Sequence, residues 1–195
     1  MSERIQLVLD AGGVIVTNLT PGFWQEIAAH GQLNEAELVG QYKQSLSASL
    51  WSGKVTEPAF WTWLSQAGPS IVIDYARERL TANLTYLPAA LRLQEWSRTM
   101  DLHLLSNHRT EWLLPVLQPY LSCFKSITIS SEAGLAKPNP DLFTRLSNTL
   151  PSGAEVIFVD DHERNLEQGR AIGWAGLIAD PENKWIDFVD AKAKI

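Results

Sequence analysis

The sequence contains very little cysteine: Cys123 is the single thiol among 195 residues. One cysteine excludes an internal disulfide and a metal site built from several cysteines. This composition is typical of a reducing compartment, and we interpret Cys123 as a core-packing residue. We therefore expect the protein to be cytoplasmic.

Clusters of positive charge and long apolar runs are also missing. The formal net charge is −6 and the pI is about 5.2, and Lys and Arg form no run. These features exclude the charge pattern of proteins that bind nucleic acid or anionic membranes, so we expect neither partner. No segment approaches the roughly 18 apolar residues of a membrane-spanning helix, and the first residues lead into a strand-like run rather than a signal peptide. A small molecule is the expected partner, and the oligomeric state stays open.

What the sequence does contain is a series of short apolar runs separated by helical patterns. The runs cover residues 5–10, 102–106, 126–130, 156–160 and 174–178. Asn139-Pro140 and Gly173 mark a helix start and a helix end between the later runs. Such an alternation of strands and helices predicts an α/β fold with a parallel, Rossmann-like sheet.

Between residues 17 and 87 the strand-like runs disappear and helix signals dominate. Thr20-Pro21, Asn34 and Thr56 stand at candidate helix starts, with apolar residues at helical spacing behind them. We expect four helices here, forming a helical-bundle cap inserted into the sheet domain. The predicted division is a core of residues 1–16 and 88–195 and a cap of residues 17–87.

The predicted cap is rich in tryptophan, and half of the eight tryptophans in the chain fall inside it. Their simplest role is to supply large apolar area to a small bundle. A glycine turn at residues 52–54 can approach a neighbouring site. The candidates for contact with a substrate are Trp24, Tyr42, Trp51 and Lys54.

Polar side chains stand where several of the predicted strands end. Asp10, Ser106 and the pair Asp160-Asp161 each end or follow an apolar run, and Lys137 precedes a helix. In parallel sheets ligands bind outside the carboxyl ends of the strands. A lone aspartate there is often a helix cap and a lone lysine is usually solvated, but the group as a whole indicates a site.

These residue types suit phosphate chemistry with a hard metal ion. Carboxylates without cysteine ligands favour Mg²⁺. An aspartate can attack phosphorus, although a carboxylate about 4 Å from a phosphate charge is repelled by roughly 4 kcal/mol per charge pair at an effective dielectric of 20. A cation between them removes that barrier. The Lys137 ammonium, the Ser106 hydroxyl and backbone N–H groups after Asp10 and around Asn107 can hold the phosphoryl oxygens.

These residues, in this order, resemble the four motifs of the haloacid dehalogenase (HAD) superfamily. The helical insert resembles the cap of the subfamily that contains phosphatases, phosphoglucomutases and true dehalogenases. The resemblance covers residues 7–178. The four motifs are Leu9-Asp10-Ala11-Gly12-Gly13-Val14, Leu104-Leu105-Ser106-Asn107, Gly134-Leu135-Ala136-Lys137-Pro138 and Val159-Asp160-Asp161-His162-Glu163-Arg164-Asn165.

The resemblance implies a role for each motif residue. Asp10 would be the nucleophile and a Mg²⁺ ligand, with the backbone carbonyl of Gly12 as a second ligand. Asp161 would bind the metal directly, and Asp160 directly or through water. The residues implied in phosphate binding are Ala11, Gly12, Ser106, Asn107 and Lys137.

The acidic pair of the fourth motif bears on the reaction, because true dehalogenases of the family lack it. The resemblance therefore implies a Mg²⁺-dependent phosphatase that acts on a small phosphorylated metabolite, with a sugar phosphate as one candidate. A haloacid dehalogenase fits less well.

Gly12 departs from the family pattern, because most phosphatases of the family have a second aspartate there. General acid–base help is worth about 10²- to 10⁴-fold, or roughly 3 to 5 kcal/mol. We favour an enzyme restricted to leaving groups that need little protonation, such as sugar 1-phosphates, aryl phosphates or acyl phosphates. Alternatively, His108 or His162 supplies the proton, or the protein is a catalytically weak or silent phosphate-binding regulatory module.

Overall fold

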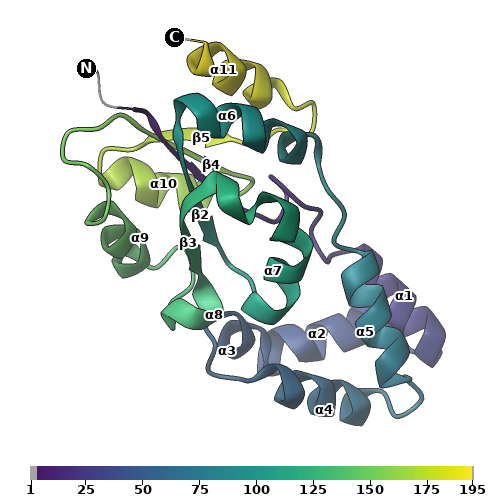
Figure 1. Ribbon diagram of the computed structural model, residues 1–195. Helices are drawn as coiled ribbons and strands as arrows, with labels where there is room; N and C mark the ends of the chain where they lie inside the picture. Colours follow the sequence, from purple (N-terminus) through teal and green to yellow (C-terminus); the bar gives the residue numbers. More distant parts are fainter. Residues whose placement is uncertain (1–3, 195) are drawn as a thin grey trace.

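A five-stranded parallel sheet forms the centre of the fold. The computed structural model describes residues 4–194. The strands lie in the order β3-β2-β1-β4-β5 (Figure 1). Every neighbouring pair is parallel, which confirms the predicted α/β fold class. The strands are β1 (Gln6–Leu9), β2 (Asp101–Ser106), β3 (Phe124–Ile129), β4 (Val156–Asp160) and β5 (Ala175–Ile178).

The two faces of the sheet pack against different helices, because successive strand residues point to opposite sides. Leu7 and Leu9 join the larger hydrophobic cluster with α6 (Leu93–Thr99), α7 (Thr110–Leu117) and α11 (Lys184–Ala193). Val8 joins the smaller cluster with α9 (Pro140–Ser147) and α10 (Glu163–Ala171). The remaining short elements are α8 (Ser130–Ala133) and the 3₁₀ helices η1 (Pro88–Arg92) and η2 (Gln118–Cys123).

Between β1 and β2 in the sequence, the five helices α1 to α5 come before η1 and α6 and lie together beyond one end of the sheet (Figure 1). We call residues 22–82 the helical segment. The prediction of four helices missed a short one, because the non-helical backbone of Leu46 splits the second helix in two. The helices are α1 (Gly22–Gly31), α2 (Glu35–Ser45), α3 (Ser47–Trp51), α4 (Glu57–Ala67) and α5 (Ile73–Ala82).

Two of the three predicted helix starts are confirmed by side-chain caps. The Asn34 carboxamide accepts a hydrogen bond from the Glu37 N–H at 3.1 Å, and the Thr56 hydroxyl accepts one from the Ala59 N–H at 3.4 Å. The cap predicted at Thr20-Pro21 is wrong. Helix α1 begins after Pro21, and no side chain caps it.

The two connections of the helical segment to the sheet run side by side. The Thr17 N–H donates to the Thr85 carbonyl at 2.9 Å, and the Thr85 N–H donates to the Thr17 hydroxyl at 3.0 Å. An antiparallel bridge joins Val16 to Tyr86. The segment therefore leaves and re-enters the sheet domain at nearly one place.

A second junction holds the turn between α3 and α4 against the sheet domain. The Arg109 guanidinium donates to the carbonyls of Val55 at 2.6 Å and Leu50 at 3.3 Å. The Ser130 hydroxyl donates to the carbonyl of Trp51 at 2.5 Å. At Gly53 the backbone φ is +72°, and a Cβ there would overlap the Ser131 carbonyl oxygen. This glycine is therefore required both by its conformation and by the close approach of the two backbones.

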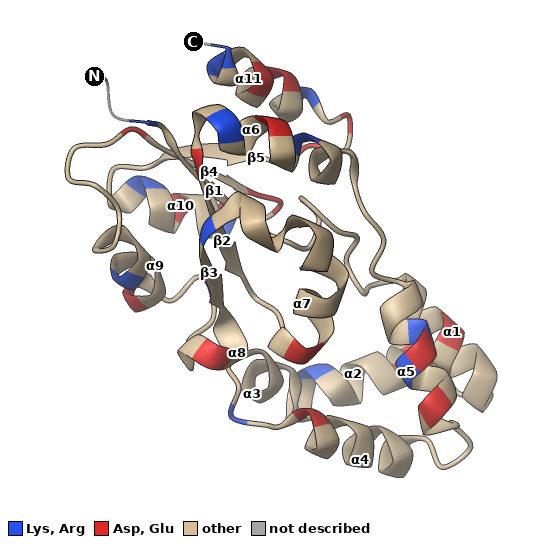
Figure 2. Ribbon diagram, in the orientation of Figure 1, with Lys and Arg blue, Asp and Glu red and all other residues tan. Residues whose placement is uncertain are grey.

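Along the ribbon of the described residues, positions of Lys and Arg are interspersed with positions of Asp and Glu (Figure 2). No helix within residues 4–194 combines the length and the apolar character that a bilayer crossing demands.

Candidate active site

A buried lysine lies between two carboxylates at the carboxyl ends of β1 and β4. The Lys137 Nζ is 2.8 Å from Asp10 Oδ2 and 2.6 Å from Asp160 Oδ2. The chain goes from β1 to β2 and β3 on one side of β1 and then returns to β4 on the other. The cluster thus occupies the switch point of the sheet, where open α/β folds bind their ligands.

Burial and the neighbouring charges raise the pKa values of both Asp10 and Lys137. Desolvation raises the pKa of Asp10 to about 6; the Lys137 ammonium opposes that rise and the Asp160 carboxylate adds to it. Burial disfavours the charge on Lys137, but the two carboxylates outweigh it and raise the lysine pKa. Lys137 therefore stays cationic and supplies the counter-charge for both aspartates.

Asp160 is held in place by bonds on both of its oxygens. Its Oδ1 accepts hydrogen bonds from the His162 N–H at 2.8 Å and from the Asn165 carboxamide at 2.9 Å, while Oδ2 contacts Lys137. The carboxylate is completely buried. Asp160 therefore lies beneath the site and orders its neighbours.

Ser106 and Asn107, at the end of β2, differ in what their side chains contact. The Ser106 hydroxyl lies close enough to Asp10 to favour the charged carboxylate slightly, yet this buried oxygen makes no hydrogen bond of normal geometry within the described residues. The Asn107 carboxamide bonds twice to the Lys137 backbone, accepting from its N–H at 2.7 Å and donating to its carbonyl at 2.9 Å. Asn107 therefore fixes the loop that carries Lys137.

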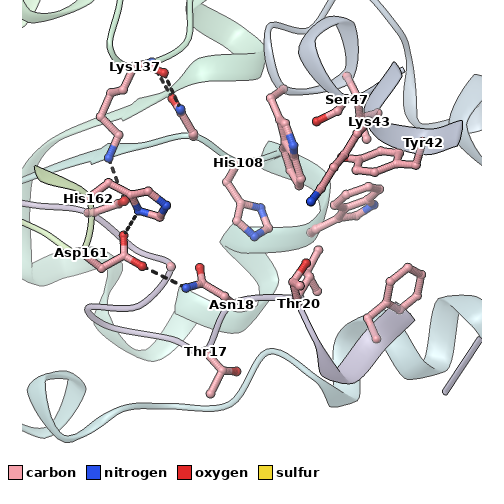
Figure 3. Close-up of a pocket in the computed structure, with 18 of the residues that line it drawn as sticks. Thr17, Asn18, Thr20, Tyr42, Lys43, Ser47, His108, Lys137, Asp161 and His162 are labelled. Atoms are coloured by element: carbon pink, nitrogen blue, oxygen red, sulfur yellow. Dashed lines mark hydrogen bonds and ion pairs between the residues drawn. The ribbon is translucent and has the colours of Figure 1, made fainter. Parts of the chain in front are cut away.

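Asp161 faces the loop that follows β1. Its Oδ2 accepts from the Asn18 carboxamide at 3.0 Å, and its Oδ1 lies 2.5 Å from His162 Nδ1 (Figure 3). Asp160, Asp161 and His162 offer ligand atoms within 4.8 Å of one another.

The loop after Asp10 is tight, and its glycines leave room for other side chains. The Ala11 N–H donates to Asp10 Oδ1 at 2.7 Å. Gly13 has φ +72°, and a side chain there would overlap the Asp161 carboxylate. A Cβ on Gly12 would lie 2.5 Å from the Asn18 side-chain oxygen. Asn18 therefore fills the space that an aspartate at position 12 would need.

A cavity of about 440 Å³ opens above this cluster, between the sheet domain and the helical segment. Asp10, Gly12, Asn107, Lys137 and Asp161 line its floor, whereas Ala11, Ser106 and Asp160 are buried behind that surface. The opposite wall comes from the helical segment. Of the predicted contact residues there, Trp24, Tyr42 and Trp51 line the cavity and Lys54 does not. Trp24 is also 4% exposed, so its predicted packing role is confirmed as well.

His108 lies in the cavity wall as a neutral imidazole. Its Nδ1 lies 2.9 Å from the Arg109 backbone nitrogen and 3.1 Å from the Arg109 carbonyl oxygen. In the first contact Nδ1 accepts and the ring hydrogen is on Nε2, whereas in the second Nδ1 donates. Burial lowers the pKa of His108 to about 4, against a smaller opposing effect of the Arg109 backbone. Figure 3 shows the ring facing the open space between Asn18 and Lys43.

Three residues of this region escaped the sequence-based reasoning: Asn18, Lys43 and Arg109. Asn18 lies in a connection with no periodic pattern, and Lys43 is one of several lysines on helices. Arg109 lies two residues after the second motif, and only its bonds to the carbonyls of Leu50 and Val55 reveal what it does.

The comparisons with known proteins agree with this architecture. The family model of the haloacid dehalogenase-like hydrolases matches residues 7–173. A HAD family enzyme from Bacteroides thetaiotaomicron is similar with a TM-score of 0.81 and 19% identity, covering 95% of this chain and 98% of that one. A predicted HAD-like hydrolase from Porphyromonas gingivalis is similar with a TM-score of 0.76 and 21% identity, covering 96% and 97%.

The fold is also similar, less closely, to an L-2-haloacid dehalogenase from Xanthobacter autotrophicus. There the TM-score is 0.62 at 16% identity, covering 90% of this chain and 76% of that one. No curated protein sequence matches this chain. The family match spans most of the chain and includes all four motifs identified in the sequence, so the chain belongs to the haloacid dehalogenase-like hydrolases.

Proposed function

We propose that this protein is a Mg²⁺-dependent phosphatase that hydrolyses a small phosphorylated metabolite through an aspartyl-phosphate on Asp10. The observation that carries the proposal is the 2.8 Å contact between Asp10 and Lys137, beside the unpartnered buried hydroxyl of Ser106 and at the floor of a cavity. A nucleophile, a fixed cation and a free donor are the groups that phosphoryl transfer needs. The Bacteroides thetaiotaomicron HAD enzyme has been solved with magnesium and inorganic phosphate, which supports the same chemistry here.

The oxygen-rich donor set of the site fits a magnesium ion. Asp10 and Asp161 would hold the ion with their carboxylates, and the Gly12 carbonyl would be a third ligand. Asp160 already bonds to Lys137, His162 and Asn165, so it would reach the ion through water. When bound, the ion would offset the repulsion between the carboxylates and a phosphate dianion.

Each side chain at the site has its own role in the proposed reaction. A carboxylate oxygen of Asp10 attacks phosphorus, and the bond from phosphorus to the leaving oxygen breaks. Lys137 and Ser106 hold the phosphoryl oxygens and balance their charge. Water attacks the aspartyl-phosphate in the second half, which releases phosphate and restores the Asp10 carboxylate. Residues 17–87 serve as a cap that keeps bulk water from the cavity.

Gly12 leaves the leaving group without the acid that most phosphatases of the family have at this position, and His108 is poorly suited to replace it. With its pKa near 4, His108 is neutral at physiological pH and can donate only a hydrogen bond, not a readily released proton. The ring of His162 is tied to Asp161 through Nδ1. These contacts favour substrates that leave readily, such as sugar 1-phosphates, aryl phosphates or acyl phosphates.

Phosphate release from para-nitrophenyl phosphate and a panel of sugar phosphates, with and without Mg²⁺, tests the proposal. We expect Mg²⁺-dependent turnover that Asp10→Asn abolishes. The matched control is Asp187→Asn on α11, an exposed aspartate away from the cavity, which should leave turnover unchanged.

Two results would contradict this function. Turnover that survives in Asp10→Asn would refute the aspartyl-phosphate step. Binding of phosphate without turnover of any substrate would instead support a silent phosphate-binding module.

A further inference from the structure

The cavity has a second polar end, away from the proposed phosphoryl site. Its floor holds every acidic residue of the lining, Asp10 and Asp161, together with the cations Lys137 and Arg164. The wall formed by α1–α5, all of which lie in the described range, contributes a single charged residue, Lys43 on α2. Figure 3 shows the Lys43 ammonium pointing into the open space toward His108.

Lys43 has no counter-ion of its own. It makes no salt bridge or side-chain hydrogen bond within residues 4–194. The neighbours one helical turn away, where an acidic partner would normally stand, are Val39, Gly40, Leu46 and Ser47. A lysine on a cavity wall without an acidic neighbour is therefore free to meet an anion brought by a ligand.

The surroundings of Lys43 are aromatic rather than acidic. Trp24 and Tyr42 lie with their ring centroids 4.7 Å apart, and Tyr42 and Phe60 are 6.3 Å apart in an edge-to-face contact. All three rings line the cavity. Lys43 itself is exposed, so its ammonium is solvated until an anion binds, while the rings beside it offer an apolar surface to the rest of a ligand.

We propose that Lys43 binds a second anionic group, a carboxylate or a phosphate, on the leaving group of the substrate. The preferred substrate is then a small phosphomonoester whose leaving group carries a ring or apolar face and a second negative charge. This inference rests on the proposed phosphatase function. It adds that Lys43 sets specificity, while the hydrolysis itself takes place on Asp10.

Matched substrates test the proposal with one variant and two controls. The first pair is a hexose 1-phosphate and the hexuronic acid 1-phosphate, which share the same leaving oxygen. The second set is phenyl phosphate with its 3-carboxy and 3-phosphono derivatives, which distinguish a carboxylate from a phosphate-like group. The variant is Lys43→Met, and the controls are Lys54→Met, on a lysine outside the cavity, and Arg164→Met, on the other unpaired cation of the lining.

We expect the parent to favour the substrates with the second anion. Lys43→Met should raise KM for those substrates by roughly tenfold, the size of one solvent-screened charge-assisted hydrogen bond, and leave kcat and the uncharged substrates nearly unchanged. Lys54→Met should behave as the parent.

Three outcomes would overturn the inference while leaving the phosphatase function intact. They are turnover without preference for any second anion, an equal effect of Lys43→Met on charged and uncharged substrates, and a preference that disappears in Arg164→Met but not in Lys43→Met. Absence of Mg²⁺-dependent phosphate release from all five substrates would refute the proposed function and this inference together.

Discussion

At the scale of single residues, His108 makes the stability of the protein depend on pH. Its pKa is about 4 in the folded chain and about 6.5 in the unfolded chain, so the unfolded state binds more protons between these values. Stability should therefore fall as the pH drops from 6.5 to 4, by about 3 kcal/mol for this residue alone. Urea unfolding at several pH values measures the effect.

The contribution of His108 is isolated by the variant His108→Asn, whose side-chain oxygen can still accept from the Arg109 N–H. The difference in unfolding free energy between parent and variant should change across this pH window and be constant above it. A difference that does not vary with pH would show that folding leaves the pKa of His108 unchanged.

Gly12 and Asn18 are linked through the space that they share. Gly12→Asp alone should gain little activity, because its Cβ would displace the Asn18 side chain and break the bond from Asn18 to Asp161. The double variant Gly12→Asp with Asn18→Ala leaves room for the acid. Its kcat on alkyl phosphates, whose alkoxides are poor leaving groups, should exceed that of either single variant at least tenfold, a part of the roughly 10²- to 10⁴-fold effect of a well-placed general acid.

An aryl phosphate serves as the control substrate for that comparison, because its leaving group needs little protonation. The rates of the three variants on it should be similar. A Gly12→Asp single variant that is already as active on alkyl phosphates as the double variant would refute the steric link.

The site residues differ in how far the sequence predicts them. Asp10, Ser106 and Asp160 could be grouped in advance, because parallel strands bring their carboxyl ends to one edge. Asn18 and Lys43 could not, since their positions depend on the path of the connection and on how α2 packs. The sequence also gave no sign that the Asn107 carboxamide would bond to the Lys137 backbone.

At the scale of elements, the turn between α3 and α4 depends on one glycine. Gly53→Ala should destabilise the protein more than Gly134→Ala, although both glycines have φ +72°. Alanine at either position costs about 1 to 2 kcal/mol of left-handed backbone strain. At Gly53 the methyl group would also overlap the Ser131 carbonyl, whereas at Gly134 it would meet open space. Chemical denaturation of both variants measures the difference.

Equal losses of stability in the two variants would show that the contact between Gly53 and Ser131 is loose in solution. A larger loss for Gly53→Ala would show that this turn helps to hold the helical segment on the sheet domain.

Elements with local signals were predictable and those without them were not. Asn34 and Thr56 cap their helices through bonds within one turn of the chain, so the sequence alone could locate them. Helix α3 was missed because the break at Leu46 has no glycine or proline to mark it. The signal at Thr20-Pro21 located the start of α1 correctly, but the expected side-chain cap is absent, because the residue at the cap position is Pro21.

At the scale of the whole molecule, one hydrophobic cluster joins the sheet to the helical segment. It contains Leu9 and Leu104 from the sheet together with Phe23, Leu64 and Leu80 from α1, α4 and α5. We therefore expect a single unfolding transition in urea, with coincident midpoints for tryptophan fluorescence and far-ultraviolet circular dichroism. The four tryptophans of residues 17–87 make fluorescence sensitive to this segment. An earlier fluorescence transition would show that the helical segment unfolds separately.

The paired connections at Thr17 and Thr85 have a consequence for how such an enzyme can change. These two residues are hydrogen-bonded neighbours, so the two ends of the insert lie side by side. For the sheet domain, the insert is therefore equivalent to a short loop between two adjacent points. Closing that loop costs entropy that grows only slowly with its length. A recombination event, or a protein engineer, can therefore exchange the intervening helices for a different set without disturbing strand order. The cavity floor at the ends of β1 and β4 would stay the same, while the cavity wall formed by the helical segment would be replaced.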